Sequence, residues 1–431
     1  MSASLFRSFV SRLLQGNPAP ARATISLSDL LGRPPVNLDT PELQRFLAGK
    51  RVMVTGAGGS IGSEICRQAI RFCPQRLLLV ERAENALFEI DRELRDRWMG
   101  ADIRPYVADV CDAGRIGDIF TAEQPQVVFH CAAHKHVPMM ELNPGEAIKN
   151  NIFGTKTLAD AAAAHGVAAF VMVSTDKAVN PTSVMGATKR VAELYVQSLN
   201  DAECRMPIAE CGRKEEDPSA ASFSFGTRHS AFGTSPTRFV AVRFGNVLGS
   251  SGSVVPIFQK QIDAGGPVTV THPEMKRYFM MIPEASQLVM QAGAIARGGE
   301  VFILDMGQPV KILDLAHELI RRNGLKPGDD IEVRFSGIRP GEKLYEELAC
   351  DYERAVPTNH PMIRVWQLPT ASASEIDQML TVLDTASRGS RADAVRALSW
   401  CVPEYRPDGA PAPAADVPTV LRLTSSESVA A

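Results

Sequence analysis

The chain has 431 residues, of which 45% are hydrophobic, 22% charged and 6% aromatic, and this composition excludes a coiled coil, a collagen-like chain and a wholly disordered protein. Its 46 basic and 49 acidic side chains give a formal net charge of -3, so charge provides no argument for nucleic acid as a partner. The eight cysteines are scattered and form no CxxC pair, which predicts reduced thiols in a cytoplasmic compartment and no metal site.

The first 45 residues are predicted to be an amphipathic segment followed by a linker. Residues 5–14 place leucine, phenylalanine and valine side chains on one helical face. Such a segment suits either a helix that docks on a partner or frays in solvent, or a peripheral contact with the inner face of the membrane. No stretch approaches the ~20 apolar residues that a membrane-spanning helix needs.

From residue 46 onward, short apolar strands alternate with helices. Strands are expected at 51–55, 76–81, 103–107, 127–131, 169–174 and 238–243. Helices are expected at 41–48, 62–72, 84–98, 113–121 and 146–165. Continuous apolar strands separated by helices indicate a parallel sheet covered on both faces, so we predict a Rossmann-like, doubly wound α/β fold.

Residues 201–237 interrupt this alternation with a polar, Gly- and Ser-rich sequence that has no clear period. A loop of that length inside a compact domain is usually functional or disordered. We favour a mobile surface insertion, and a lid over the active site is the alternative.

The sequence VMVTGAGGSIGSEI places Gly56, Gly59 and Gly62 between a strand and a helix. Glycine is needed there because a side chain would keep the backbone away from a pyrophosphate, and the helix that follows offers free N–H groups. Glu81 closes the second strand about 20 residues later, where a carboxylate accepts hydrogen bonds from ribose and repels a 2'-phosphate. The pattern favours NAD, and Arg82 keeps NADP open. A glycine turn that only packs a helix on the sheet is the other interpretation.

Seven segments resemble the motifs of a known family. They are TGAGGSIGSE (55–64), HCAAHKHVPMMELNP (130–144), NNIFGT (150–155), STDKAVNPTSVMGATKR (174–190), VRFGNVLGSSGSVVPIF (242–258), THPEMKRYFMMIPEA (271–285) and GIRPGEKLYEEL (337–348). With these segments, the chain from about residue 25 to residue 348 resembles the CapD-like polysaccharide biosynthesis family. Members are nucleotide-sugar 4,6-dehydratases of the extended short-chain dehydrogenase/reductase superfamily.

The resemblance implies a Rossmann-like sheet completed by a smaller, discontinuous C-terminal substrate-binding lobe. The expected divisions are a catalytic domain at 46–350, made of an NAD-binding core at 46–245 and a sugar-nucleotide lobe at 246–350, then a helical extension at 351–406 and a disordered tail at 407–431. The implied reaction converts UDP-N-acetylglucosamine to a UDP-4-keto-6-deoxy-N-acetylhexosamine. Hydride leaves carbon 4, water is lost across carbons 5 and 6, and hydride returns to carbon 6. The expected setting is bacterial surface polysaccharide biosynthesis by a homo-oligomer.

Residues 174–189 carry the implied chemistry. Asp176 and Lys177 lie at the carboxyl end of a strand and supply an acid and a base. In the family pattern the aspartate is the acid for water loss and the lysine is the base for carbon 5. Thr175 would hydrogen-bond the oxygen on carbon 4, and Lys189 would bind the nicotinamide ribose. Met185 stands where the superfamily has a tyrosine that removes a proton, which a thioether cannot do.

Three functions stay open at this point. Larger members of the family carry methionine at this position with a similar flanking motif, which favours an active dehydratase with Asp176 and Thr175 taking over the work of the tyrosine. An NAD(P)-binding pseudo-enzyme or sensor is the second hypothesis. A UDP-sugar 4-epimerase is the third, although it needs the missing tyrosine.

The resemblance also implies two sets of binding residues. The cofactor set is Gly56, Gly59, Ser60, Ile61, Gly62, Glu81, Arg82, Asp109, Val110, Ala132, Ala133 and Lys189. The substrate set is Lys135, His136, Glu141, Asn246, Arg277, Arg339 and Glu342. Arginine suits a diphosphate because its planar guanidinium donates two parallel hydrogen bonds. For His136 and Glu141, a mutual surface pair is the alternative.

Overall fold

The computed structural model describes residues 40–200, 237–347, 354–367 and 370–407. The predictions for the amphipathic segment, for nearly all of the insertion at 201–237 and for the tail from residue 408 lie outside these residues.

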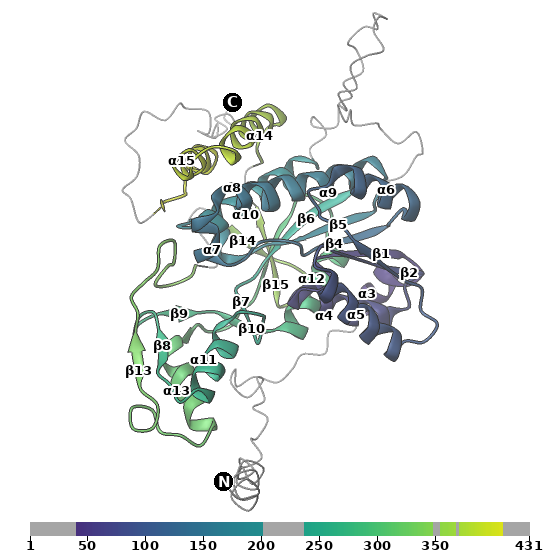
Figure 1. Cartoon of the computed structure of the whole chain (residues 1–431). Helices are drawn as coiled ribbons and strands as arrows, with labels where there is room; N and C mark the ends of the chain where they lie inside the picture. Colours follow the sequence, from purple (N-terminus) through teal and green to yellow (C-terminus); the bar gives the residue numbers. More distant parts are fainter. Residues whose placement is uncertain (1–39, 201–236, 348–353, 368–369, 408–431) are drawn as a thin grey trace, which may run out of the picture.

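A nine-stranded sheet forms the centre of the structure, in the order β14-β15-β11-β6-β5-β4-β1-β2-β3 (Figure 1). Its strands are β1 Arg51–Thr55, β2 Arg76–Glu81, β3 Ile103–Val107, β4 Val127–His130, β5 Ala169–Val173, β6 Arg238–Arg243, β11 Val301–Leu304, β14 Arg354–Pro357 and β15 Ile363–Gln367. From β3 to β11 every neighbouring pair is parallel. The doubly wound α/β fold predicted from the sequence is therefore confirmed.

Residues 354–367 depart from the helical extension expected at 351–406. They form β14 and β15, which extend the sheet with antiparallel pairing next to β11. The strand forms because Ile363 and Trp366 are both buried against the main domain. The helical part of the extension begins only with α14 Ala373–Ser387 and α15 Arg391–Cys401.

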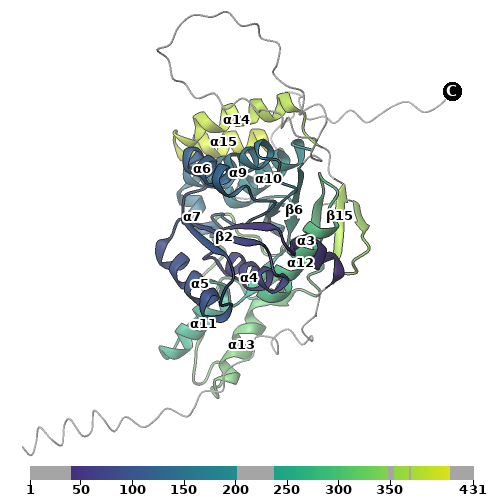
Figure 2. The same cartoon turned by 90° about the vertical axis from the view of Figure 1, so that its right-hand side faces the viewer.

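Helices cover both faces of the sheet because the strands between them are apolar on both sides. One face carries α3 Pro41–Leu47, α4 Ser60–Ala69, α5 Glu84–Arg97 and α12 Ile282–Ile295 (Figure 2). The other carries α6 Ala113–Glu123, α9 Gly154–Ala164 and α10 Val184–Ser198, with the short helix α8 Pro144–Ala147 beside α10 (Figures 1 and 2). Helices α14 and α15 lie over this second layer, and every residue of α10 is buried. Met185 and Lys189, the two predicted site residues on α10, therefore lie on a fully packed helix.

The helix expected at 146–165 contains a π-helical segment, η2 Ile148–Phe153, between α8 and α9. Such segments often occur at functional sites. Here Asn151 accepts the backbone N–H of His134 at 2.8 Å and donates to the carbonyl oxygen of the same residue at 3.1 Å. It thereby fixes the loop that follows β4.

The smaller lobe has an apolar core of its own, which includes Phe258, Ile262 and Leu319. Its elements are β7 Asn246–Leu248, α11 Val254–Asp263, β8 Val268–Val270, β9 Lys276–Arg277, β10 Phe279–Met281, β12 Val310–Lys311, α13 Ile312–Arg322 and β13 Val333–Phe335. Between β10 and β12 the chain returns to the main sheet as α12 and β11. The lobe is therefore discontinuous, as predicted.

A buried ion pair joins β6 to α10. Arg243 donates to both carboxylate oxygens of Glu193 at 2.8 Å, and the two side chains are 1% and 0% exposed. The Ser174 hydroxyl also donates to this carboxylate, at 2.6 Å. Because Ser174 directly follows β5, this contact anchors the start of the segment that carries the predicted chemistry.

Among the described residues, no helix combines the length and the apolar surface that crossing a bilayer requires.

Candidate active site

The turn after β1 forms a cradle that side chains would fill. Gly56 has a φ of +66°, and a Cβ on it would lie 2.8 Å from the backbone nitrogen of Ala132. A Cβ on Gly62 would lie 2.0 Å from the carbonyl oxygen of Gly56. Gly59 is the N-cap of α4, and no described side chain caps this ten-residue helix. Its amino end therefore offers N–H groups to an anion, with Ser60 next to the cradle.

The surroundings of the cradle fit a dinucleotide. Glu81 ends β2, and its carboxylate accepts the backbone N–H groups of Gly58 at 3.2 Å and Ala83 at 3.0 Å. Each oxygen keeps a lone pair for a ribose hydroxyl. Arg82 lies 4.0 Å from Asp109, so a carboxylate already balances part of its charge. The donor and acceptor set thus fits the adenosine ribose of a nicotinamide dinucleotide.

Gly62→Ala is expected to weaken dinucleotide binding by about 10- to 100-fold, because overpacking against backbone costs about 1–3 kcal/mol. The Cβ would meet the carbonyl oxygen of Gly56, which cannot move without opening the turn. Titration of the purified variant with NAD, followed by protein fluorescence, measures the change. Gly117→Ala on α6 is the matched control, since its Cβ would meet nothing within 4 Å. Equal affinities in the two variants would show that the cradle holds no ligand.

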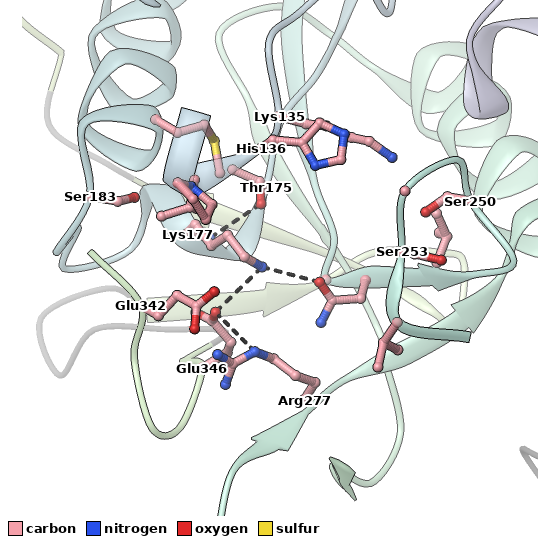
Figure 3. A pocket seen from close by; sticks show the side chains of 18 of the residues that line it. Lys135, His136, Thr175, Lys177, Ser183, Ser250, Ser253, Arg277, Glu342 and Glu346 are labelled. Carbon is pink, nitrogen blue, oxygen red and sulfur yellow. Dashed lines mark hydrogen bonds and ion pairs between the residues drawn. The ribbon is translucent and has the colours of Figure 1, made fainter. Parts of the chain in front are cut away.

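A cavity of about 660 Å³ opens at the carboxyl ends of β1, β4, β5 and β6, where the main sheet meets the smaller lobe (Figure 3). It is lined by these predicted residues: Gly59, Ser60, Ile61, Gly62, Ala133, Lys135, His136, Thr175, Lys177, Met185, Lys189, Asn246, Arg277, Arg339 and Glu342. The predicted residues outside its lining are Gly56, Glu81, Arg82, Asp109, Val110, Ala132, Glu141 and Asp176. The cavity therefore joins the cradle to the predicted substrate residues, and the expected adenosine contacts lie beyond it at the ends of β2 and β3.

Thr175, Asp176 and Lys177 form a compact group on a short 3-10 turn, η3 Asp176–Ala178, after β5. The Thr175 hydroxyl donates to Oδ1 of Asp176 at 2.9 Å, and Lys177 Nζ donates to the same oxygen at 3.0 Å. The Asp176 side chain is fully buried, and its Oδ2 has no partner among the described residues. A Cβ on Gly245 would lie 3.0 Å from Oδ2, so glycine at this position keeps the space beside that oxygen open.

Lys177 also contacts the smaller lobe (Figure 3). Its Nζ lies 3.4 Å from Oε1 of Glu346 and donates to Oδ1 of Asn246 at 3.3 Å. Burial works to lower the pKa of Lys177, but the charges of Asp176 and Glu346 outweigh burial and the pKa is raised above its usual value. Lys177 is therefore an ammonium ion in this arrangement.

Met185 and Lys189 lie four residues apart on α10 and face the cavity together. Burial lowers the pKa of Lys189 to about 8, and the carboxylate of Glu193 opposes part of this shift. Lys189 therefore brings to the cavity an ammonium group that can lose its proton close to neutral pH. The thioether of Met185 offers neither a proton donor nor a base in the place of the usual tyrosine.

His130 is a packed strand residue. Its Nδ1 lies 2.8 Å from the hydroxyl of Thr55 and its Nε2 3.0 Å from the hydroxyl of Thr155. Burial, aided by the charge of Lys189, lowers the pKa of His130 to about 3. It is neutral and has both ring nitrogens engaged.

Glu141 does not take the position expected of a substrate ligand or of a partner for His136. Its Oε1 accepts the backbone N–H of Val184 at 2.7 Å, and its Oε2 lies 3.2 Å from the guanidinium of Arg391. It joins α7 Val137–Leu142 to α10 and α15 and lies outside the cavity lining. Lys135 and His136 do line the cavity, and a Cβ on Gly252 would lie 2.7 Å from the His136 ring.

The two predicted diphosphate arginines differ in availability. Arg277 donates to the backbone carbonyls of Lys276, Lys343 and Leu344, and its Nε lies 3.5 Å from Oε1 of Glu346. It therefore ties the loop after β13 to β9 in this conformation.

Arg339 has a half-exposed side chain whose guanidinium lies 3.8 Å from the carboxylate of Glu342. Oε2 of Glu342 is buried and has no partner among the described residues. Lys343 donates to the carbonyl oxygen of Val179 at 2.9 Å, which anchors the loop that presents Arg339. Arg339 is thus the better placed of the two arginines for an incoming anion.

Sequence reasoning missed two features of the cavity. Glu346 belongs to the motif GIRPGEKLYEEL but was assigned no role, since nothing in the motif shows that one of its carboxylates reaches Lys177. The loop GSSGS before α11 also lines the cavity, and the backbone N–H of Ser251 donates to the hydroxyl of Ser60 at 3.1 Å. Its Gly and Ser content next to a helix start was the available signal.

A doubly wound sheet with a glycine cradle after β1, a lysine on the helix after β5 and a lobe inserted beyond β6 defines the extended short-chain dehydrogenase/reductase class. The chain belongs to the polysaccharide biosynthesis protein family, whose sequence profile matches residues 52–367. This confirms the family that the sequence motifs indicate.

Individual relatives agree with this assignment. Capsular polysaccharide biosynthesis protein CapD of Staphylococcus aureus is 54% identical over 325 residues, which are 75% of this chain and 49% of that protein. The chain thus spans about half the length of CapD and of another relative, the probable polysaccharide biosynthesis protein EpsC of Bacillus subtilis. An inverting UDP-N-acetylglucosamine 4,6-dehydratase of Campylobacter jejuni is 32% identical over 301 residues, 69% of this chain and 77% of that enzyme.

A solved structure supports the fold. The X-ray structure of Pen from Bacillus thuringiensis superposes with a TM-score of 0.63 at 34% sequence identity and covers 76% of this chain and 90% of its own.

Proposed function

We propose that the chain is a nucleotide-sugar 4,6-dehydratase that converts UDP-N-acetylglucosamine to a UDP-4-keto-6-deoxy-N-acetylhexosamine for surface polysaccharide. The observation that carries this proposal is the group of Thr175, Asp176 and Lys177, in which Thr175 and Lys177 line the same cavity as the glycine cradle. A dehydration needs an acid and a base beside the hydride-transfer site, and a simple dehydrogenase does not. The 32% identity to a UDP-N-acetylglucosamine 4,6-dehydratase supports the same choice.

The proposed cofactor is NAD, with NADP as the alternative. The α4 amino end and Glu81 would hold it, and Lys189 would contact the nicotinamide ribose. When bound, the cofactor supplies a hydride acceptor that becomes the donor later in the same cycle.

The geometry of the free atoms supports the roles that the family resemblance implies for the chain's own residues. Oδ1 of Asp176 already accepts two hydrogen bonds, so Oδ2 would carry the proton given to the departing hydroxyl at carbon 6. The Thr175 hydroxyl would hold the oxygen on carbon 4 and pass the proton of that hydroxyl to Asp176, to which it already donates at 2.9 Å. This would be the proton that Asp176 later gives to the departing hydroxyl. Lys177 would take the proton from carbon 5, for which it must first become neutral. The proposed homo-oligomer and the contact through residues 5–14 stay predictions.

Incubation of the purified chain with UDP-N-acetylglucosamine tests the proposal. We expect the product mass to fall by one water without added reductant, because the hydride is returned. An unchanged mass with a new hexose configuration would instead establish an epimerase, and an unchanged substrate would establish a protein that binds the cofactor without turnover.

A further inference from the structure

Glu346 bridges two of the cations that line the cavity, Lys177 and Arg277. Its Oε1 lies 3.4 Å from Lys177 Nζ and 3.5 Å from Arg277 Nε (Figure 3). The side chain is 3% exposed and lines the cavity. Its second oxygen, Oε2, is buried and has no hydrogen-bond partner among the described residues. A buried carboxylate oxygen without a partner is destabilising, so this oxygen calls for an explanation.

The groups that face Lys177 come from four elements. Asp176 lies on its own turn, Asn246 on β7, Arg277 on β9 and Glu346 on the loop after β13. Two carboxylates and one guanidinium therefore surround the ammonium, together with a neutral amide. With water in the cavity, this set favours a charged lysine, and a charged lysine cannot accept a proton from carbon 5.

Removal of water from the cavity shifts the protonation equilibrium between Lys177 and the carboxylates around it. An ammonium and a carboxylate in a low-dielectric site lose the hydration that stabilises them, and the neutral amine and carboxylic acid become favourable by comparison. A substrate that fills the cavity would expel this water. Arg277 holds Glu346 beside Lys177 while this happens, because its other donors are engaged with the backbone of the same loop.

We propose that Glu346 is a positioning residue for Lys177 and the store for its proton, a role that rests on the dehydratase function proposed above. When the sugar nucleotide closes the cavity, one N–H bond of Lys177 breaks and one O–H bond forms on Glu346, with no change in total charge. The neutral amine then takes the proton of carbon 5 and later returns it there. On product release the Glu346 proton goes back to Lys177, which restores the starting ion pair.

Asp176 cannot serve as this store. Its Oδ1 accepts hydrogen bonds from both Thr175 and Lys177, and its Oδ2 is the oxygen assigned to the hydroxyl at carbon 6. Glu346 has no other assigned task. The separation of 3.4 Å between Nζ and Oε1 is that of a free protein, and such contacts tighten in the substrate complex.

Glu346→Gln tests the proposal, because glutamine keeps the shape but holds neither charge nor proton. In the wild type, kcat for water loss is expected to be flat from neutral to alkaline pH, since the proton moves internally. In the variant, Lys177 must lose its proton to solvent, so kcat falls about 10- to 100-fold at neutral pH and rises as pH increases. Glu347→Gln is the control, because Glu347 is exposed and pairs with Lys343.

A second measurement does not depend on turnover. The rate of amine acylation at Lys177, followed by peptide mass spectrometry against pH, reports its protonation in the folded protein. We expect the pKa of Lys177 to fall in Glu346→Gln and to stay unchanged in Glu347→Gln. A wild-type rate and a flat profile in Glu346→Gln, or an unchanged acylation profile, would overturn the role of Glu346. Absence of water loss in the wild type would instead overturn the proposed function. The acylation profile would still show whether Glu346 raises the pKa of Lys177.

Discussion

Lys177→Ala is expected to abolish water loss while the cofactor stays bound. Lys177 is the only described cation in contact with Asp176 at the end of β5, and its Nζ faces the cavity. Loss of a general base lowers rates by about 10²–10⁴-fold, and we expect a value near the upper end because the same side chain also orients Asp176. Its contacts with the cradle are indirect, so binding of NAD should be little changed.

The measurement is a single-turnover assay with UDP-N-acetylglucosamine, accompanied by a titration with NAD. Lys311→Ala is a suitable control, since Lys311 pairs with Glu274 on the surface of the smaller lobe. Turnover near that of the wild type in Lys177→Ala would exclude Lys177 as the base. A variant that loses NAD as well would show that the substitution disturbs the main domain.

The Lys177 and Glu346 variants together give a stricter test. If the two side chains act as a unit, their effects cannot add, because the proton store has no purpose once the amine is gone. The double variant Lys177→Ala with Glu346→Gln should therefore be no slower than Lys177→Ala alone. Fully additive losses would mean that Glu346 acts elsewhere in the reaction.

The sequence was sufficient for the features that depend on local pattern. The six strands from β1 to β6 were predictable because each is a short apolar run between helices, and the cradle because Gly56, Gly59 and Gly62 have a fixed spacing. The strands β14 and β15 were not, because their pairing at the edge of the sheet depends on partners far away in the chain.

The roles of individual side chains were harder to predict from the sequence than the positions of the strands and motifs. Glu141 was expected at the substrate, but its guanidinium partner, Arg391, lies 250 residues further along the chain and on a helix that motif comparison did not cover. The same limit applies to Glu346, whose contact with Lys177 spans two lobes. For Glu141 and Glu346 alike, the role depends on which cationic side chain the carboxylate contacts, and this is known only from the folded structure.

Glu193→Ala is expected to be strongly destabilising, by about 3–5 kcal/mol, because it removes the carboxylate from a buried ion pair and leaves the buried guanidinium without this counter-ion. Arg243 loses a carboxylate that it contacts twice at 2.8 Å, and Ser174 loses the acceptor of its hydroxyl. Chemical denaturation of the purified variant measures this loss. Asp384→Asn, which removes an exposed pair with Arg388, should change stability by less than about 1 kcal/mol.

The effect of Glu193→Ala should extend to catalysis even in the fraction that stays folded. Ser174 immediately precedes Thr175, so without its anchor the turn that carries Asp176 and Lys177 is less restrained. Small displacements of reacting groups lower kcat steeply. We therefore expect kcat to fall more than affinity for NAD, whose cradle lies on a different turn. If kcat per folded molecule stays at the wild-type value, the buried ion pair serves stability alone and the turn is held by its backbone contacts with β6.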